Sequence, residues 1–144
     1  MIHVSQKKLD KSYRHLRQEC EKNTPGSNAK LLLFIYAIES GVKALLLKKK
    51  HITDTYKLSK DKEESENLTH NLRMLLINAS YPGPRPLPEN FKFLNRSRKP
   101  ETVSLADLHQ ALRYGGTFVD SIDKETLNAK LQKIDSWLQE ELES

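Results

Sequence analysis

The sequence predicts a small all-α protein, a single-domain bundle of about five helices, and three observations support this. Residues 29–50 (AKLLLFIYAIESGVKALLLKKK) are apolar on nearly all sides up to Ile38 and then narrow to an apolar stripe. A helix with that pattern is buried by several neighbours. Four further segments repeat leucine and other apolar residues at helical spacing. No segment makes a convincing strand, so the long apolar helix is expected at the centre of a helical bundle.

The composition agrees with one ordinary globular domain. The chain has 144 residues, of which 37% are hydrophobic and 30% charged, which is too apolar for a fully disordered protein. The first residues contain no apolar signal-peptide region, and the single Cys20 needs no oxidising compartment. The central helix is interrupted by charges and is too short to cross a bilayer. We therefore expect a cytoplasmic protein with no membrane segment. The sequence contains no HExxH motif, no paired-cysteine zinc spacing and no glycine-rich phosphate loop, so no metal and no cofactor are expected.

Helix boundaries follow from capping residues and from proline and glycine. The predicted helices span residues 5–22, 28–50, 67–79, 104–114 and 124–142. The expected N-caps are Ser5, either Ser27 or Asn28, Ser104 with Asp107 as a capping-box partner, and Asp123. Residues 81–88 contain four prolines and are expected to form an extended connector between the third and fourth helices.

Two features of the central helix carry structural expectations. Gly41 costs about 1 kcal/mol relative to alanine, and either a close approach by another helix or simple tolerance would account for it. Glu39 and Lys43 are one turn apart and oriented favourably for an internal ion pair. Residues 51–66 sustain no periodicity and predict a loop or a frayed helix end.

Three stretches together resemble the HEPN domain superfamily. YAIESGVKALLLKK, residues 36–49, is similar to the Ala-x-Glu-x-x-x-Lys-Ala-Leu-Leu signature of the second HEPN helix. THNLRMLL, residues 69–76, resembles the His-Asp/Asn-Leu helix of the family. ALRYGG, residues 111–116, resembles its Ala-Arg-Tyr-Pro helix end. The resemblance covers the chain from Ser5 to Leu142 in helix order.

The resemblance implies an up-down helical bundle, frequently a homodimer, from bacterial defence and toxin–antitoxin systems. Many HEPN proteins are metal-independent ribonucleases that use an Arg-x4–6-His motif. This chain lacks the motif: no histidine follows Arg14 or Arg17 at that distance, and the next one after Arg96 and Arg98 is His109. A member without catalytic activity is therefore expected.

A non-standard ribonuclease site is the alternative. His109 and Arg113 are four residues apart and share a helix face, and Tyr114 follows directly. An arginine can stabilise a phosphorane-like charge while a histidine moves protons. The more common role of such a pair is a solvent-facing one at a helix end. His70, the remaining candidate, is more often a packing residue than a catalytic one.

Basic residues supply the candidate binding surfaces. The net charge of +5 divides into −4 for residues 120–144 and +9 for residues 1–119. The candidate binding residues are Lys48, Lys49, Lys50, Arg85, Phe91, Lys92, Arg96, Arg98 and Lys99. Cations interleaved with Phe91 and Phe93 can follow the phosphates of single-stranded RNA while bases stack on the rings. Alternatively the phenylalanines are core anchors, and the same cations suit an acidic protein.

Two functions follow from these observations. The first is a non-enzymatic protein of a bacterial conflict system, such as an immunity protein or antitoxin, that neutralises a toxic protein partner by occlusion, for example a nuclease. The second is a HEPN-type ribonuclease toxin or RNA-binding protein that uses His70, His109, Arg113 and Tyr114. The proline-rich connector favours a binding role in either case, because a pre-ordered segment loses less entropy on docking.

Overall fold

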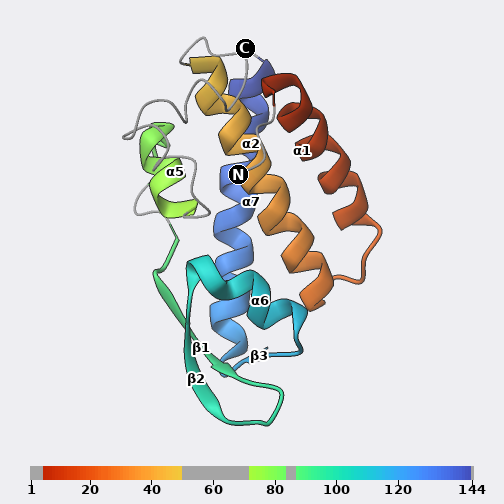
Figure 1. Cartoon of the computed structure of the whole chain (residues 1–144), viewed down its shortest axis with the longest axis vertical. Helices are drawn as coiled ribbons and strands as arrows, with labels where there is room; N and C mark the ends of the chain where they lie inside the picture. Colours follow the sequence, from red (N-terminus) through yellow and green to blue (C-terminus); the bar gives the residue numbers. More distant parts are fainter. Residues whose placement is uncertain (1–4, 50–71, 84–86, 144) are drawn as a thin grey trace.

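Three long helices lie side by side and form the body of the protein (Figure 1). They are α1 (Gln6–Glu21), α2 (Asn28–Lys49) and α7 (Ser121–Glu143). The computed structural model describes residues 5–49, 72–83 and 87–143. The shorter elements are α5 (Leu72–Asn78), β1 (Asn90–Leu94), β2 (Pro100–Ser104), the 3-10 helix η1 (Leu105–Asp107), α6 (Leu108–Arg113) and β3 (Thr117–Phe118).

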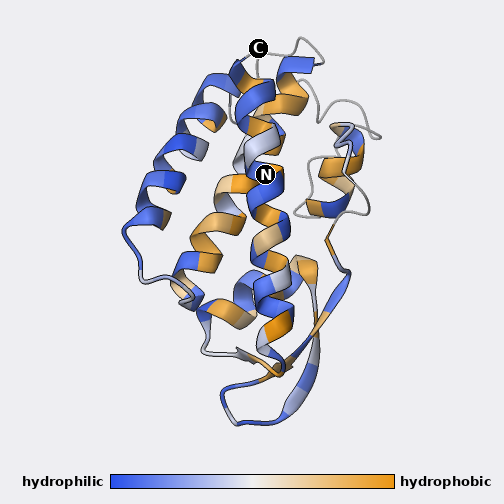
Figure 2. Cartoon of the chain, turned by 180° about the vertical axis from the view of Figure 1, so that it is seen from behind, coloured by the Kyte–Doolittle hydropathy of each residue, from blue (hydrophilic) through white to orange (hydrophobic). Residues whose placement is uncertain are grey.

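Helix α2 lies at the centre, as its apolar sequence predicts. It contacts α1, α5, α6 and α7, so side chains on nearly all of its faces are buried. Figure 2 shows the apolar residues gathered along α2, whereas the outer side of α1 is hydrophilic. The buried residues of α2 are Leu31, Ile35, Ala37, Ile38, Gly41, Val42, Ala44, Leu45, Leu46 and Leu47. The expectation of a predominantly helical protein is confirmed.

Gly41 marks a point where α1 and α7 approach α2 closely. A Cβ atom at this position would lie 2.9 Å from Cδ1 of Tyr13 and 3.0 Å from Cδ1 of Leu138. Both distances are shorter than normal carbon–carbon contacts. The close approach of other helices therefore explains the glycine, and it outweighs the helix propensity that alanine would add.

The prediction of a purely α-helical fold is wrong for residues 90–118. Strand β1 pairs antiparallel with β2 and with β3, in the order β2-β1-β3. Phe91 lies opposite Val103, and both are buried together with Phe93. The hairpin covers the end of the helical body because its inner face supplies these apolar side chains (Figure 1).

Several predicted boundaries shift when the chain folds. The fourth predicted helix is split into η1 and α6, and α7 begins at Ser121, ahead of the predicted start at residue 124. Near that start Asp120 Oδ1 accepts a hydrogen bond from Ile122 N (2.9 Å), whereas Asp123 lies inside the first turn. The caps Ser5, Ser27 and Ser104 are confirmed, since each hydroxyl accepts a backbone N–H three residues on. The predicted loop at 51–66 and residues 67–71 of the third predicted helix lie outside the described residues.

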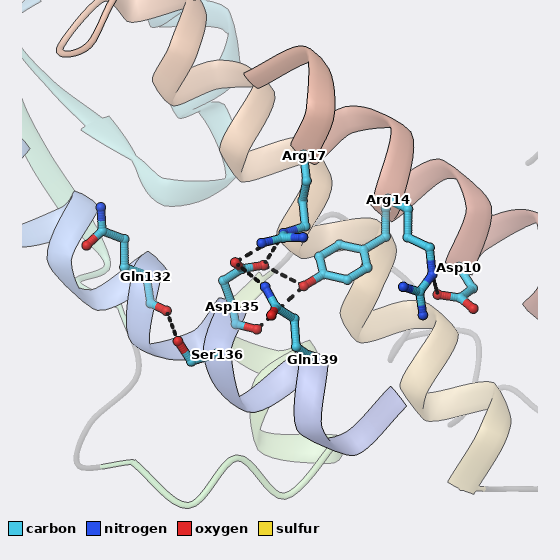
Figure 3. A network of polar contacts seen from close by, with 8 residues as sticks. Asp10, Arg14, Arg17, Gln132, Asp135, Ser136 and Gln139 are labelled. Carbon is cyan, nitrogen blue, oxygen red and sulfur yellow. Dashed lines mark hydrogen bonds and ion pairs between the residues drawn. The ribbon is translucent and has the colours of Figure 1, made fainter. Parts of the chain in front are cut away.

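A polar network joins α1 to α7 within this body (Figure 3). The Tyr13 hydroxyl donates to Oδ1 of Asp135 at 2.5 Å, and Arg17 Nε lies 3.0 Å from the same carboxylate. Gln139 Nε2 donates to its other oxygen at 3.0 Å. Asp135 is buried, and three donors satisfy it, as a buried carboxylate requires. This network fixes the relative position of α1 and α7. Arg17 has a structural role in it as the counter-charge of Asp135.

Tyr13 makes the free energy of unfolding depend on pH in the alkaline range. Burial, followed by the hydrogen bond and charge of Asp135, raises the pKa of Tyr13 far above its ordinary value of 10.0. The protonated Tyr13 hydroxyl therefore contributes its full stabilisation below about pH 10. This stabilisation is lost as pH rises further, because the tyrosine ionises at a lower pH in the unfolded chain than in the folded protein. Above about pH 10 the free energy of unfolding of the native protein should fall faster than that of Tyr13→Phe, by about 1.4 kcal/mol per pH unit. Urea titrations of both proteins across this range would measure the difference, and parallel pH profiles would contradict it.

Candidate functional site: a basic hairpin and a polar cleft

The turn that joins β1 to β2 is built by Asn95. Its side-chain Oδ1 accepts from the backbone N of Ser97 (2.9 Å) and from that of Lys99 (3.0 Å). Its own backbone N donates to Lys99 O (2.9 Å), and its carbonyl accepts from Arg98 N (2.8 Å). Asparagine is favoured in turns because its side chain bonds to the backbone that follows it. Asn95 thus bonds the backbone of the turn at both ends, and the side chains of Arg96, Arg98 and Lys99 are exposed.

Four exposed cations lie on this hairpin, which we call the basic hairpin: Lys92, Arg96, Arg98 and Lys99. Figure 1 shows the hairpin reaching past the ends of the long helices. None of the four forms an ion pair with any residue in the described parts of the chain. Four positive charges, set against the exposed carboxylate of Glu101 on β2, are therefore presented at one end of the protein.

Arg98 holds a backbone conformation that is unusual for its residue type. Its φ angle is 64°, in the left-handed region. That region costs a residue with a side chain roughly 1 to 2 kcal/mol, whereas glycine adopts it readily and asparagine does so more easily than most. The turn thus carries an arginine where a glycine or asparagine would be more stable.

The two phenylalanines of β1 are core residues. Phe93 is fully buried, and its ring centroid is 4.3 Å from that of Phe118. Phe91 is 4% exposed and packs edge-on against Phe118 at 5.9 Å. The core-anchor alternative is therefore correct, and neither ring presents a face on which a nucleic-acid base could stack. Phe91 therefore has no exposed ring with which to bind a ligand.

The lysines at the end of α2 form contacts within the protein. Lys48 Nζ donates to two carbonyl oxygens in the last turn of α7, at 3.0 and 3.3 Å. Lys49 Nζ donates to Ala79 O at 2.6 Å and lies 5.6 Å from the ring centroid of Trp137. The two lysines therefore stabilise the packing of α7 and of the segment after α5 against α2. The predicted residues that lie outside the described parts are Lys50, His70 and Arg85.

His109 and Arg113 share a face of α6, as their spacing predicts, and this face is turned toward α2. Arg113 Nη2 donates to the Tyr36 hydroxyl at 3.0 Å, and the His109 ring is tilted against the Tyr36 ring at 6.3 Å. Tyr114 is separated from them: it is 67% exposed and lines a different groove, together with Arg96. Tyr114 is therefore not brought together with His109 and Arg113 as the alternative site requires.

The Glu39–Lys43 ion pair forms, and it lines the same cleft as His109 and Arg113. Lys43 Nζ lies 3.0 Å from Glu39 Oε1, and both side chains are largely buried. The cleft has a volume of about 440 Å³. Tyr36 is not among the site residues that the sequence predicts. Its spacing nevertheless places it on the same helical face as Glu39 and Lys43, three and seven residues before them.

A larger hollow, about 620 Å³, lies between α1, α2 and α7. Cys20 is at its wall, where its thiol donates to Lys30 O at 3.4 Å and burial raises the pKa of the thiol. A buried thiol with a raised pKa is a poor nucleophile. Cations and carboxylates are balanced in number around this hollow, so it favours no charged ligand.

Comparison with protein-family models, curated proteins and solved structures finds no match to this chain. Within the described ranges, no three acidic, histidine or cysteine side chains are grouped so that they could hold a metal ion. None of the helices described is both long enough and apolar enough to span a membrane.

Proposed function

We propose that this protein is a non-enzymatic binding protein that recognises an acidic surface of a protein partner through the basic hairpin. The observation that carries the proposal is the set of four exposed cations with no ion pair among the described residues. Charges of one sign steer a complementary partner and orient it on docking. The lysines of α2, by contrast, are engaged within the protein.

The arginine at position 98 supports a binding role for the turn. A strained backbone conformation that the sequence could relieve by a glycine or asparagine is a reason to infer a function. Here the strained residue is also one of the four cations. The side chain of Arg98 is thus the feature that the turn retains at a cost in stability.

A protein partner is favoured over RNA because the two phenylalanines that suggested a stacking platform are buried, although the exposed ring of Tyr114 lines a groove with Arg96. Binding of single-stranded nucleic acid combines a basic track with aromatic rings on which bases stack. Phe91 and Phe93 are buried beneath the hairpin, so the cations stand without the rings that had suggested RNA. Electrostatic complementarity with an acidic protein needs no exposed ring.

The biological role that we propose follows from the resemblance to HEPN domains. A HEPN-like protein without the ribonuclease motif is suited to act as an immunity protein or antitoxin of a bacterial conflict system. It would neutralise a toxic partner, for example a nuclease, by occluding it. Homodimerisation, which is frequent in that superfamily, is part of this proposal.

Neutralising the turn of the hairpin tests the proposal. The triple variant Arg96→Gln, Arg98→Asn, Lys99→Gln should weaken partner binding roughly tenfold or more, since each charged contact at an interface rim contributes up to about 1 kcal/mol. Asparagine at 98 tolerates the left-handed backbone, so the turn itself is kept. The partner would first be recovered by affinity purification after nuclease treatment, and its affinity for both forms then measured.

The matched control removes three exposed cations elsewhere: Lys7→Gln, Lys11→Gln and Lys133→Gln. These changes lower the net charge equally and should leave the affinity within about twofold. Equal losses in both triple variants would contradict a hairpin-specific interface. Recovery of RNA alone, with binding that weakens steeply as salt rises, would instead favour the ribonuclease or RNA-binding alternative at His70, His109 and Arg113. Growth arrest on expression of the chain alone would point the same way.

A further inference from the structure

We propose that the cleft between α2 and α6 binds a carboxylate that is attached to an apolar body. The cleft is defined by Tyr36, Glu39 and Lys43 of α2 and by His109 and Arg113 of α6. It is separate from the basic hairpin, and the proposal does not depend on the function assigned to that hairpin.

The charges around the cleft select an anion with a single charge. Glu39 lies 3.0 Å from Lys43, so this pair contributes no net charge. Arg113 forms no ion pair with the residues described, so the described lining of the cleft carries a formal charge of one positive unit, with histidine counted as neutral. A phosphate with two negative charges would add repulsion from the Glu39 carboxylate. A carboxylate balances the cleft, and it matches the planar guanidinium of Arg113.

The hydrogen bond between Arg113 and Tyr36 positions both side chains to donate to this anion. One guanidinium nitrogen donates to the Tyr36 hydroxyl at 3.0 Å, which holds the arginine at the edge of the cleft. A guanidinium has five N–H donors, so others remain for the two oxygens of a carboxylate. The Tyr36 hydroxyl accepts from Arg113 and keeps its own proton to donate. Two side chains from different helices thus offer donors at one point.

Most of the remaining wall of the cleft is apolar, which determines the rest of the ligand. Its apolar residues are Leu9 and Leu16 of α1, Ile35 of α2, Leu72 of α5 and Leu105 and Ala106 of η1, and Ser40 of α2 adds one hydroxyl. A cleft of about 440 Å³ is within the range that binds small molecules, which are usually held by an apolar lining and a few polar groups. An alkyl or aryl chain, or the apolar side chain of a peptide C-terminal residue, would cover this wall.

Two pairs of probes test the proposal and distinguish the two sources of such a carboxylate. Octanoate and octanamide differ only in the charged head group. Acetyl-Leu-Leu with a free C-terminus and the same peptide with an amidated C-terminus make the equivalent pair. Binding would be followed by chemical-shift changes in isotope-labelled full-length protein. At least one acid should bind tenfold or more tightly than its amide, and the pair that shows the larger ratio identifies a free acid or a peptide terminus as the source.

Two substitutions that should change the affinity in opposite directions make the test specific. Arg113→Gln should weaken binding of the acid about tenfold or more, because it removes the unpaired charge. Glu39→Gln should strengthen it several-fold, because Lys43 then adds a second positive charge. Arg14→Gln, an exposed arginine of α1 that does not line the cleft, should leave the affinity unchanged. Thermal unfolding of each variant verifies the fold, and Arg113→Gln keeps the test valid if Glu39→Gln does not fold.

Three results would overturn the proposal. One is equal binding of acid and amide in both pairs, which would mean that only the apolar wall is recognised. Another is an affinity of the acid that Arg113→Gln leaves unchanged. The third is tighter binding of inorganic phosphate than of either acid, which would contradict the selection of a single charge.

Discussion

Replacement of Phe93 by alanine is expected to lower the free energy of unfolding by about 4 kcal/mol. The side chain is fully buried, its ring is 4.3 Å from that of Phe118, and a Cβ on Gly116 would lie 3.0 Å from its Cδ2. Removal of a buried phenylalanine loses its transfer free energy and leaves a cavity, for a total of about 3 to 5 kcal/mol. Urea denaturation followed by circular dichroism measures the change, with a lower midpoint and an unchanged slope.

The matched control is the neighbouring residue on the opposite face of the same strand. Lys92 is exposed, so Lys92→Ala should change the free energy of unfolding by less than about 0.5 kcal/mol. If Phe93→Ala kept the native stability and instead lost affinity for single-stranded RNA, the ring would have to act at the surface. That result would restore the RNA-binding alternative.

The helical part of the fold could be predicted because its signals are local. The apolar run of α2 and the apolar residues at helical spacing in α1 and α7 each identify a helix without knowledge of its neighbours. The sheet lacks such a signal. Its period-two pattern is limited to Phe91 and Phe93, and the ladder that completes it pairs β1 with residues 100–104 and 117–118. Such pairing is non-local and leaves only a short pattern in each strand.

The contents of the cleft were predictable as separate pairs but not as one site. The spacing of Glu39 and Lys43 predicts their ion pair, and the spacing of His109 and Arg113 predicts a shared helix face. That both pairs line one cleft depends on how α6 packs across α2, which no local pattern contains. Tyr36, which bonds Arg113 from the other helix, becomes significant only through that packing.

The basic residues show a second limit of sequence reasoning. Lys48, Lys49 and the cations of the hairpin are equivalent in composition and clustering. In the structure the two lysines donate to carbonyl oxygens of neighbouring elements, whereas the cations of the hairpin are exposed and form no ion pair with the residues described. A cation that is bonded within the protein and a cation that is exposed to a partner cannot be distinguished from the sequence pattern.

Asp135→Ala is expected to lower the free energy of unfolding by about 3 kcal/mol. Asp135 lies in the acidic C-terminal segment, yet it is buried and accepts from Tyr13, Arg17 and Gln139. Alanine would remove the carboxylate that accepts from the buried Tyr13 hydroxyl at 2.5 Å, leaving only the backbone oxygen of residue 135 at 3.5 Å, and would leave the Arg17 guanidinium without its counter-charge. Loss of one partner from a buried ion pair costs about 3 to 5 kcal/mol. The lower end applies because Arg17 is partly exposed and regains some hydration. Urea denaturation at neutral pH measures the loss.

A double-mutant cycle identifies the source of this loss. Tyr13→Phe removes one donor, and Asp135→Ala in that background should cost at least about 1 kcal/mol less than in the native protein, because no tyrosine hydroxyl is left without its carboxylate acceptor. Glu140→Ala, on the exposed part of the same helix, is the control and should change stability by less than about 0.5 kcal/mol. Additive losses would show that Asp135 and Tyr13 act independently. A coupling of the expected sign would establish the network as the contact that holds α1 against α7.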